Sequence, residues 1–146
     1  MGNVSPTQNK PKSQDCAWDF SGCKNLNHLS SKHLKSYFDR LIKLAGLTFI
    51  DSIFYKFGDG GEGISYVAVI GESHVAIHSW PEDRYLQLTI DYCNHSQNND
   101  EKAVRLQRYF RKFFKPKKTE THLTRERGVP CPVRKSKTPE RLLRAA

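Results

Sequence analysis

The sequence predicts an α+β fold, a two-layer sandwich in which two helices cover one face of a mostly antiparallel sheet. Two stretches with apolar residues at helical spacing alternate with short stretches rich in β-branched and aromatic residues. Their order is strand, helix, four strands, helix and strand, which is typical of α+β domains. A chain of 146 residues suits one such domain with a modest core.

The first predicted elements are a short strand and an amphipathic helix. The strand occupies residues 16–20, and the helix begins at Ser30 or Ser31, whose side chains suit an N-cap. Gly46 is a residue type that commonly ends helices. The residues expected to face the core from this helix are Leu34, Phe38, Leu41, Ile42 and Ala45.

Four strands are predicted in the middle of the chain, at residues 47–57, 64–70, 75–78 and 85–93. The glycine-rich loop 58–63 separates the first two. We expect a hairpin loop there and not a phosphate-binding loop, because neither a Gly-Lys-Ser/Thr sequence nor a helix follows it.

A second helix and an edge strand complete the predicted fold. Asn99 or Asp100 caps the helix, and Pro116 ends it. Residues 119–128 form the edge strand. The buried stripe of the helix is expected to contain Ala103, Leu106, Phe110 and Phe113.

These elements divide the chain into a disordered extension (1–15), one domain (16–128) and a basic flexible tail (129–146). Residues 1–101 hold 9 Lys and Arg against 12 Asp and Glu, whereas residues 102–146 hold 15 against 3. The basic third of the chain is interpreted either as a solvated helix face followed by a tail or as a surface for an anionic partner.

Nothing in the sequence indicates a membrane or secreted protein. No apolar run approaches the roughly 20 residues that a membrane-spanning helix needs, and the N-terminus has no apolar signal region. We therefore expect a cytoplasmic protein without a membrane partner. The four cysteines form no Cys-x-x-Cys pair, so thiols are expected, with no disulfides and no cysteine-based metal site.

One face of the predicted sheet carries polar side chains. The strand 85–93 alternates, with Leu86, Leu88, Ile90 and Tyr92 on one side and Tyr85, Gln87, Thr89, Asp91 and Cys93 on the other. By the same alternation, His74 and His78 join the second set. Because both helices cover the apolar side, the polar side is predicted to be a functional site or an oligomer interface.

Three interpretations compete for the stretch 71–82, GESHVAIHSWPE. A hydrolase nucleophile turn is disfavoured, because Val75 stands where Gly-x-Ser-x-Gly needs its second glycine and no helix follows. A metal site of His74 and His78 with Cys93 or Asp91 is also disfavoured, since His-x-x-x-His alone is a weak signal. In the third interpretation, Ser73 attacks its own backbone.

The stretch 63–82, GISYVAVIGESHVAIHSWPE, resembles the bacterial S-adenosylmethionine decarboxylase proenzyme family. Its members share a Gly-Val-Ser segment, Glu-Ser-His, a hydrophobic pair and Ile-His-Thr-Trp-Pro-Glu, followed by a cysteine 15 positions after the histidine. His78 and Cys93 keep that spacing. DFSGC at 19–23 and Arg-Gly at 127–128 match further family signatures, so the resemblance covers roughly residues 16–128.

The resemblance implies self-cleavage between Glu72 and Ser73. Ser73 Oγ attacks the Glu72 carbonyl, and elimination and hydrolysis leave a pyruvoyl group, the self-derived cofactor, at residue 73. His78, as proton acceptor, and Ser65 are the family's processing residues. Gly71 is expected to allow unusual backbone angles just upstream.

The resemblance also implies the reaction and its binding residues. The pyruvoyl carbonyl forms a Schiff base with S-adenosylmethionine and drains electrons as carbon dioxide leaves, which supplies the aminopropyl donor for spermidine and other polyamines. Cys93 corresponds to the proton donor. Glu82 corresponds to a ribose-binding glutamate and Phe57 to an aromatic residue that stacks on adenine.

Several departures from the family pattern leave alternatives open. If Tyr66 and Arg84 line the pocket, they favour a second interpretation, in which the same pyruvoyl mechanism acts on arginine or ornithine. Short members of the family pair into homodimers that share sites between subunits, which predicts a four-layer αββα stack across the polar face. A non-catalytic binding module, whose basic tail engages nucleic acid or an acidic partner, is the alternative from another class.

Overall fold

The computed structural model describes residues 13–26, 31–58, 62–94 and 97–128, and these residues form an α+β sandwich. The order of elements is the predicted one. The elements are β1 (Ser13–Ser21), α1 (Ser31–Ala45), β2 (Phe49–Lys56), β3 (Ile64–Ile70), β4 (Ser73–Trp80), the 3₁₀ turn η2 (Pro81–Asp83), β5 (Tyr85–Cys93), α2 (Asp100–Phe114) and β6 (Lys118–Arg127).

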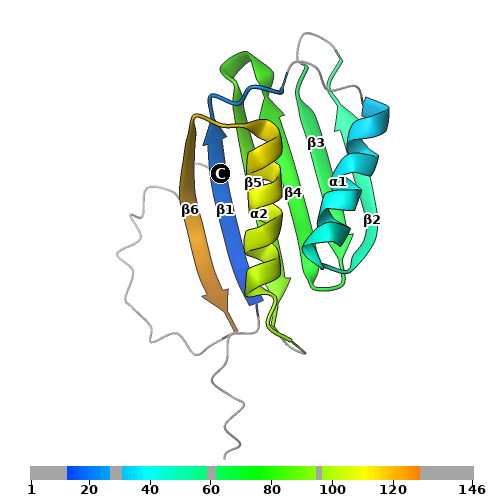
Figure 1. The fold of residues 1–146 in the computed structure, drawn as a ribbon, viewed down its shortest axis with the longest axis vertical. Coiled ribbons are helices and arrows are strands. Elements are labelled where there is room, and N and C mark those ends of the chain that lie inside the picture. Colours follow the sequence, from blue (N-terminus) through cyan, green and yellow to red (C-terminus); the bar gives the residue numbers. More distant parts are fainter. Residues whose placement is uncertain (1–12, 27–30, 59–61, 95–96, 129–146) are drawn as a thin grey trace, which may run out of the picture.

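The six strands form one sheet in the order β2-β3-β4-β5-β1-β6, and every neighbouring pair is antiparallel. Both helices lie on the same face of this sheet, with α1 over β2 and β3 and α2 over β5 and β1 (Figure 1). The predicted two-layer architecture is therefore confirmed. The expected stacking of two sheets is a property of a dimer and stays a prediction.

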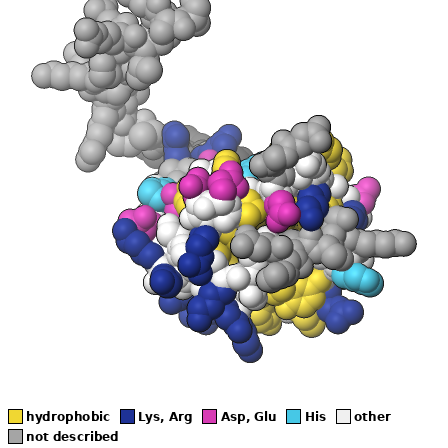
Figure 2. Space-filling model, turned by 90° about the horizontal axis from the view of Figure 1, so that it is seen from above, with side chains coloured by type: hydrophobic (Ala, Val, Ile, Leu, Met, Phe, Trp, Pro, Cys, Tyr) yellow, Lys and Arg dark blue, Asp and Glu magenta, His cyan; other side chains and the backbone are white. Residues whose placement is uncertain are grey.

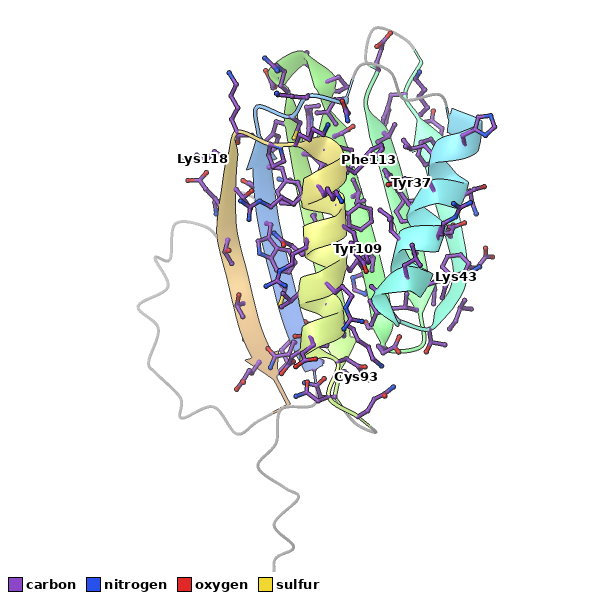
Figure 3. All side chains as sticks on the ribbon, in the orientation of Figure 1. Tyr37, Lys43, Cys93, Tyr109, Phe113 and Lys118 are labelled. Atoms are coloured by element: carbon purple, nitrogen blue, oxygen red, sulfur yellow. The ribbon has the colours of Figure 1, made fainter. Side chains whose placement is uncertain are left out.

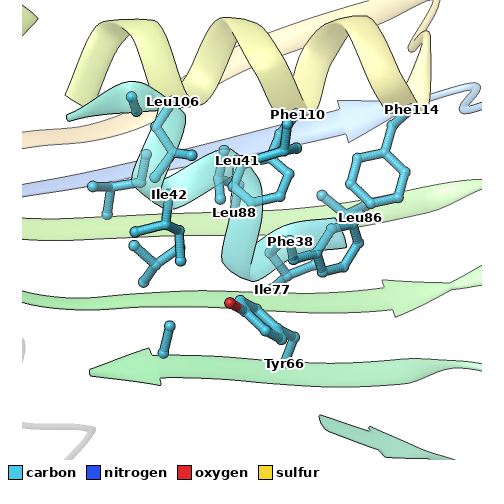
Figure 4. Packing of buried hydrophobic residues seen from close by; sticks show 14 of the residues in the cluster. Phe38, Leu41, Ile42, Tyr66, Ile77, Leu86, Leu88, Leu106, Phe110 and Phe114 are labelled. Atoms are coloured by element: carbon cyan, nitrogen blue, oxygen red, sulfur yellow. The ribbon is translucent and has the colours of Figure 1, made fainter. Parts of the chain in front are cut away.

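The core lies between the sheet and the two helices. Phe38 of α1 is at its centre, with its ring 5.2 to 5.8 Å from four other aromatic rings (Figure 4). The alternation predicted for β5 is confirmed, because Leu86, Leu88 and Ile90 are fully buried beneath the helices. Burial of these large apolar side chains is the main stabilising term of the fold.

The helices agree with the sequence prediction except at one position. All five predicted apolar residues of α1 are buried. In α2, however, Phe114 is fully buried, whereas Phe113 is only partly buried and packs on Tyr37 of α1, with ring centroids 5.0 Å apart (Figure 3). A step of four from Phe110 continues the stripe that faces the sheet, and Phe113 instead fills the groove between the two helices.

Two strands are longer than predicted. Strand β1 includes residues 13–15, which the prediction assigned to a disordered extension, because β1 pairs with β5 on one side and β6 on the other. Strand β4 begins at Ser73 and not at residue 75. The expected disorder of residues 1–12 and the flexible tail 129–146 lie outside the described residues.

The face of the sheet opposite the helices, here called the open face, carries an apolar row across its middle. The row contains Ile53, Val67, Ala76 and Ala17, with Thr89 between the two alanines in the strand register. Ile53 is 74% exposed and Val67 40%. A polar row lies on each side of it, one with His74 and Asp91 and the other with Ser65 and His78.

The basic side chains of the second half of the chain are exposed. Figure 2 shows lysine and arginine side chains gathered on one side of the end of the molecule that carries η2. Exposed lysines and arginines of α2 and the segment that follows it are Arg105, Arg108, Arg111, Lys112, Lys115, Lys117 and Lys118. Within the described residues, no helix is long and apolar enough to cross a bilayer.

Candidate active site

The predicted cleavage point lies in the tight turn between β3 and β4. The Glu72 side chain is buried and both of its carboxylate oxygens are held by Thr48, whose backbone N–H donates at 3.0 Å and whose hydroxyl donates at 3.0 Å. The Gly71 N–H donates to the Thr48 carbonyl at 2.7 Å. These bonds fix the turn on the side that precedes Ser73.

The backbone carbonyl of Glu72 is held from the other side by the end of β5. The Cys93 N–H donates to this carbonyl oxygen at 2.8 Å. Figure 3 shows Cys93 at the end of the sheet opposite Lys118. The carbonyl that Ser73 would attack therefore already faces a backbone donor, and such a donor stabilises the negative charge that develops on an attacked carbonyl oxygen.

The Ser73 hydroxyl is exposed and lies beside a histidine of its own strand. Its Oγ is 3.1 Å from His74 Nδ1, and His74 Nε2 is 3.2 Å from Asp91 Oδ2 on β5. Ser73 has a φ of +156°. Successive side chains of a regular strand point to opposite faces of the sheet. The Ser73 hydroxyl nevertheless contacts the side chain of the next residue, His74.

The expected role of Gly71 is corrected by its backbone. Within the described residues, the glycines with positive φ are Gly22, Gly46 and Gly128, and Gly71 is not among them. A Cβ at Gly71 would instead lie 3.0 Å from Thr48 Cβ. Glycine suits this position because the turn packs closely against Thr48, and not because of an unusual backbone angle.

Four predicted site residues gather at the other end of the sheet. Phe57, Ser65, His78 and Glu82 line one pocket of about 350 Å³. This volume lies within the range of small-molecule sites, about 300–1,000 Å³. The remaining lining residues are Gly63, Ile64, Ser79 and Trp80.

Hydrogen bonds between β3 and β4 organise this pocket. Ser65 Oγ lies 2.9 Å from His78 Nδ1, so the two predicted processing residues are in direct contact. The Ser79 hydroxyl accepts the Ile64 N–H at 3.0 Å, and the Phe57 N–H donates to the Gly63 carbonyl at 2.9 Å. Phe57 is thereby held to Gly63, and both residues line the pocket.

The seven predicted site residues thus form two groups at opposite ends of the sheet within one chain. Ser73 and His78 are five residues apart on β4, a separation of about 16 Å along a strand. Glu72, Ser73 and Cys93 lie together at one end, and the four pocket residues lie at the other.

The metal interpretation gains no support from this geometry. His74 and His78 are four residues apart on β4, about 13 Å, so one ion cannot bind both. His74 contacts Asp91 and His78 contacts Ser65. Among the described residues, no group of three or more potential metal ligands is present.

Tyr66 and Arg84, whose presence in the pocket would have favoured arginine or ornithine as substrate, do not line it. Tyr66 is fully buried on the helix-covered face, and its hydroxyl donates to Asp39 Oδ1 at 2.8 Å. Arg84 donates from Nε to the Cys23 carbonyl at 3.3 Å. Their presence therefore gives no support to a different substrate.

Sequence reasoning missed three features of these two groups. Trp80 borders the pocket, Thr48 anchors the turn, and Asp91 is the carboxylate partner of His74. The alternation of β5 had already placed Asp91 on the same face as His74, but its pairing depends on the register between β4 and β5.

Comparison with known proteins places these features in a family. A family model described as S-adenosylmethionine decarboxylase matches residues 14–127. An S-adenosylmethionine decarboxylase proenzyme of Sulfurihydrogenibium is 31% identical over 106 residues, which cover 73% of each chain. One of Methanococcus maripaludis is 30% identical over 108 residues, covering 74% of this chain and 83% of the relative.

A solved structure shares the fold. The crystal structure of the adenosylmethionine decarboxylase of Aquifex aeolicus matches with a TM-score of 0.70 at 24% sequence identity. The match covers 84% of this chain and 96% of that one. It supports the order and packing of the elements described above.

Proposed function

Because the chain belongs to the S-adenosylmethionine decarboxylase family, we propose that it cleaves itself between Glu72 and Ser73 and then decarboxylates S-adenosylmethionine. The observation that carries this proposal is the geometry of the turn. The Glu72 carbonyl accepts the Cys93 N–H, and the hydroxyl of the next residue lies beside an imidazole. Nucleophile, carbonyl and backbone donor thus meet at one peptide bond.

Self-cleavage requires an N→O acyl shift at this bond. Ser73 Oγ attacks the Glu72 carbonyl carbon, and the Cys93 N–H stabilises the resulting oxyanion. The C–N bond then breaks and leaves an ester between Glu72 and the Ser73 side chain. Elimination at Ser73 splits the ester, and hydrolysis converts residue 73 into a pyruvoyl group with release of ammonia. The two hydrogen bonds from Thr48 hold the Glu72 side in place.

The described residues fit a pyruvoyl group at position 73. Residue 73 is exposed at the start of β4, where a carbonyl is accessible to a substrate amine. The pyruvoyl group supplies an electron-accepting carbonyl for decarboxylation. Cys93, half-buried and adjacent through its backbone to the cleavage point, is the proposed proton donor to the product.

The pocket at the other end is the proposed binding site for the nucleoside part of the substrate. Phe57 presents an aromatic face for adenine, and Glu82 presents a carboxylate for the ribose hydroxyl groups. Trp80 adds a second large aromatic side chain. Arginine and ornithine have no part that needs an aromatic pocket, so this composition favours S-adenosylmethionine over them.

A second copy of the chain is needed to bring the two groups together. A two-fold axis that runs between two open faces and crosses their strands would place the pocket of one copy over the cleavage turn of the other. Such a dimer would bury the apolar row, whose residues Ile53 and Val67 are otherwise exposed to water. We therefore propose a homodimer with two sites, each shared between subunits.

Intact mass tests the proposal. The purified chain should give two fragments split between residues 72 and 73, and phenylhydrazine should label the new terminus at residue 73. The Ser73→Ala variant should remain one chain and release no carbon dioxide from S-adenosylmethionine. An unbroken wild-type chain that is nevertheless active would refute self-cleavage.

Two further measurements test the later steps. Cys93→Ala should process but turn over about 10²-fold or more slowly, because general acid catalysis contributes about that much. Carbon dioxide release should be measured side by side from S-adenosylmethionine, arginine and ornithine. Faster release from either amino acid would replace the proposed substrate and keep the mechanism.

A further inference from the structure

The most specific arrangement that the proposed roles leave unused is the contact chain Ser73–His74–Asp91. It joins three side chains of one subunit by two polar contacts of 3.1 and 3.2 Å. His78, the histidine that the family resemblance assigns to processing, is about 16 Å away along the same strand. Within one chain, the histidine that contacts the attacking hydroxyl is therefore His74.

The orientation of the ring suits a base. Asp91 Oδ2 lies 3.2 Å from His74 Nε2, and a carboxylate beside this nitrogen favours the tautomer that carries its proton on Nε2. Nδ1 is then left with a free electron pair that points at Ser73 Oγ. This is the tautomer that a proton acceptor for a serine hydroxyl requires.

The surroundings of Asp91 keep its carboxylate available to the imidazole. Asp91 Oδ1 is buried and has no hydrogen-bond partner among the described residues, so His74 is the main side-chain partner of the group. Burial raises the pKa of Asp91, and the nearby His74 acts in the opposite direction. Asp15 of β1 and Arg127 of β6 also face the pair, and they bind each other at 3.0 Å.

We infer that His74 is the catalytic base for the first step of self-cleavage and that Asp91 is its positioning residue. As the Ser73 Oγ–carbon bond forms, the Oγ proton moves to His74 Nδ1, and Asp91 stabilises the imidazolium. When the C–N bond breaks, the same proton passes to the Ser73 nitrogen, which leaves as a free amine. The proton count is thus balanced within one chain, and His78 of a second copy remains available for later processing steps.

The inference rests on the proposed self-cleavage and is tested by the rate at which newly made chains break. Chains labelled during cell-free synthesis are followed by gel electrophoresis at several pH values. His74→Gln should slow cleavage about 100-fold or more, as expected for loss of a general base. Asp91→Asn should slow it by about 10-fold to 100-fold, the factor that one hydrogen bond to a charged group supplies.

A matched control lies on the same open face. His122 Nε2 contacts Asp19 Oδ2 at 2.8 Å, a histidine–aspartate pair away from the turn, so His122→Gln should cleave at the wild-type rate. The cleavage rate of the wild-type chain should depend on pH, and the His74→Gln chain should lose this dependence. Added imidazole should partly restore cleavage of newly made His74→Ala chains, because the His74 side chain of a single chain is 44% exposed.

The outcomes separate the two proposals. A wild-type chain that never breaks refutes the proposed function and this inference together. A wild-type chain that breaks, alongside a His74→Gln chain that breaks within about twofold of its rate, refutes the inference alone. Failure of imidazole to restore His74→Ala, when that variant has the wild-type circular dichroism spectrum, also counts against a base at this position.

Discussion

At the scale of single residues, Tyr66 shows how position in a strand decides the role of a side chain. Its hydroxyl donates to Asp39 Oδ1 at 2.8 Å, and the same oxygen accepts the Ser52 hydroxyl at 2.6 Å. Burial raises the pKa of Tyr66 well above its usual range. Because Ser65 and Tyr66 are neighbours in β3, alternation alone places them on opposite faces, and the pocket takes Ser65.

Tyr66→Phe should therefore reduce stability without changing substrate recognition. Loss of a hydrogen bond to the partly buried carboxylate of Asp39 is expected to lower the free energy of unfolding by about 1.5–3 kcal/mol. Urea denaturation of the uncleaved Ser73→Ala background measures this loss. The control is Tyr109→Phe, since within the described residues the Tyr109 hydroxyl makes no hydrogen bond. A changed KM for S-adenosylmethionine in Tyr66→Phe would mean that Tyr66 reaches the substrate after all.

At the scale of elements, the β3–β4 turn and the segment before β2 form one unit. Thr48 binds the Gly71 N–H through its carbonyl and the Glu72 carboxylate through its N–H and hydroxyl. These contacts join two segments that are 24 residues apart in the chain. The position of the cleavable peptide bond therefore depends on how closely Gly71 approaches Thr48.

Gly71→Ala should disturb this unit and slow self-cleavage. The new Cβ would lie 3.0 Å from Thr48 Cβ and 3.2 Å from its Cγ2, so Thr48 must move. Small misplacements of reacting groups cost large factors in rate, and we expect a loss of about tenfold or more. Gly58→Ala is the matched control, because a Cβ there meets no atom within 4 Å. Equal cleavage rates in the two variants would contradict a role for this close packing.

Periodicity predicted the elements well because burial on one face repeats along each of them. The buried residues of α1 and the alternation of β5 follow directly from spacing. The exchange of Phe113 and Phe114 could not be foreseen, since spacings of three and four are both helical and the position of α1 decides between them. Strand β1 was underestimated because its polar start is stabilised by pairing with β5 and β6, which local sequence does not reveal.

At the scale of the whole molecule, motif spacing named the proposed site residues but not their distribution in space. Resemblance to a family gives the members of a site without saying which copy of the chain supplies each one. The separation of Ser73 from His78 became visible only when both were placed on β4. The partner of His74 likewise required the register between β4 and β5.

Mixing two inactive chains tests the shared site. Ser73→Ala retains the pocket and His78→Ala retains the nucleophile, so each should be inactive alone. When the two chains are produced together in one cell, a mixed dimer has one intact site, and the His78→Ala chain should be cleaved. Mass spectrometry of differently tagged chains detects the cut. An uncut His78→Ala chain in a verified mixed dimer would show that the site is not shared in this way.

The strand order has a further consequence for the mature protein. The proposed break after Glu72 would assign β1, β2 and β3 to one polypeptide and β4, β5 and β6 to the other. Since β1 lies between β5 and β6, and β3 lies against β4, the two polypeptides are interleaved along three seams of the sheet. Only non-covalent contacts would then hold the two polypeptides together. After thermal denaturation they would have to reassociate in a bimolecular reaction. The proposed cleavage would thus turn one chain into a pair of chains whose recovery from heat depends on concentration.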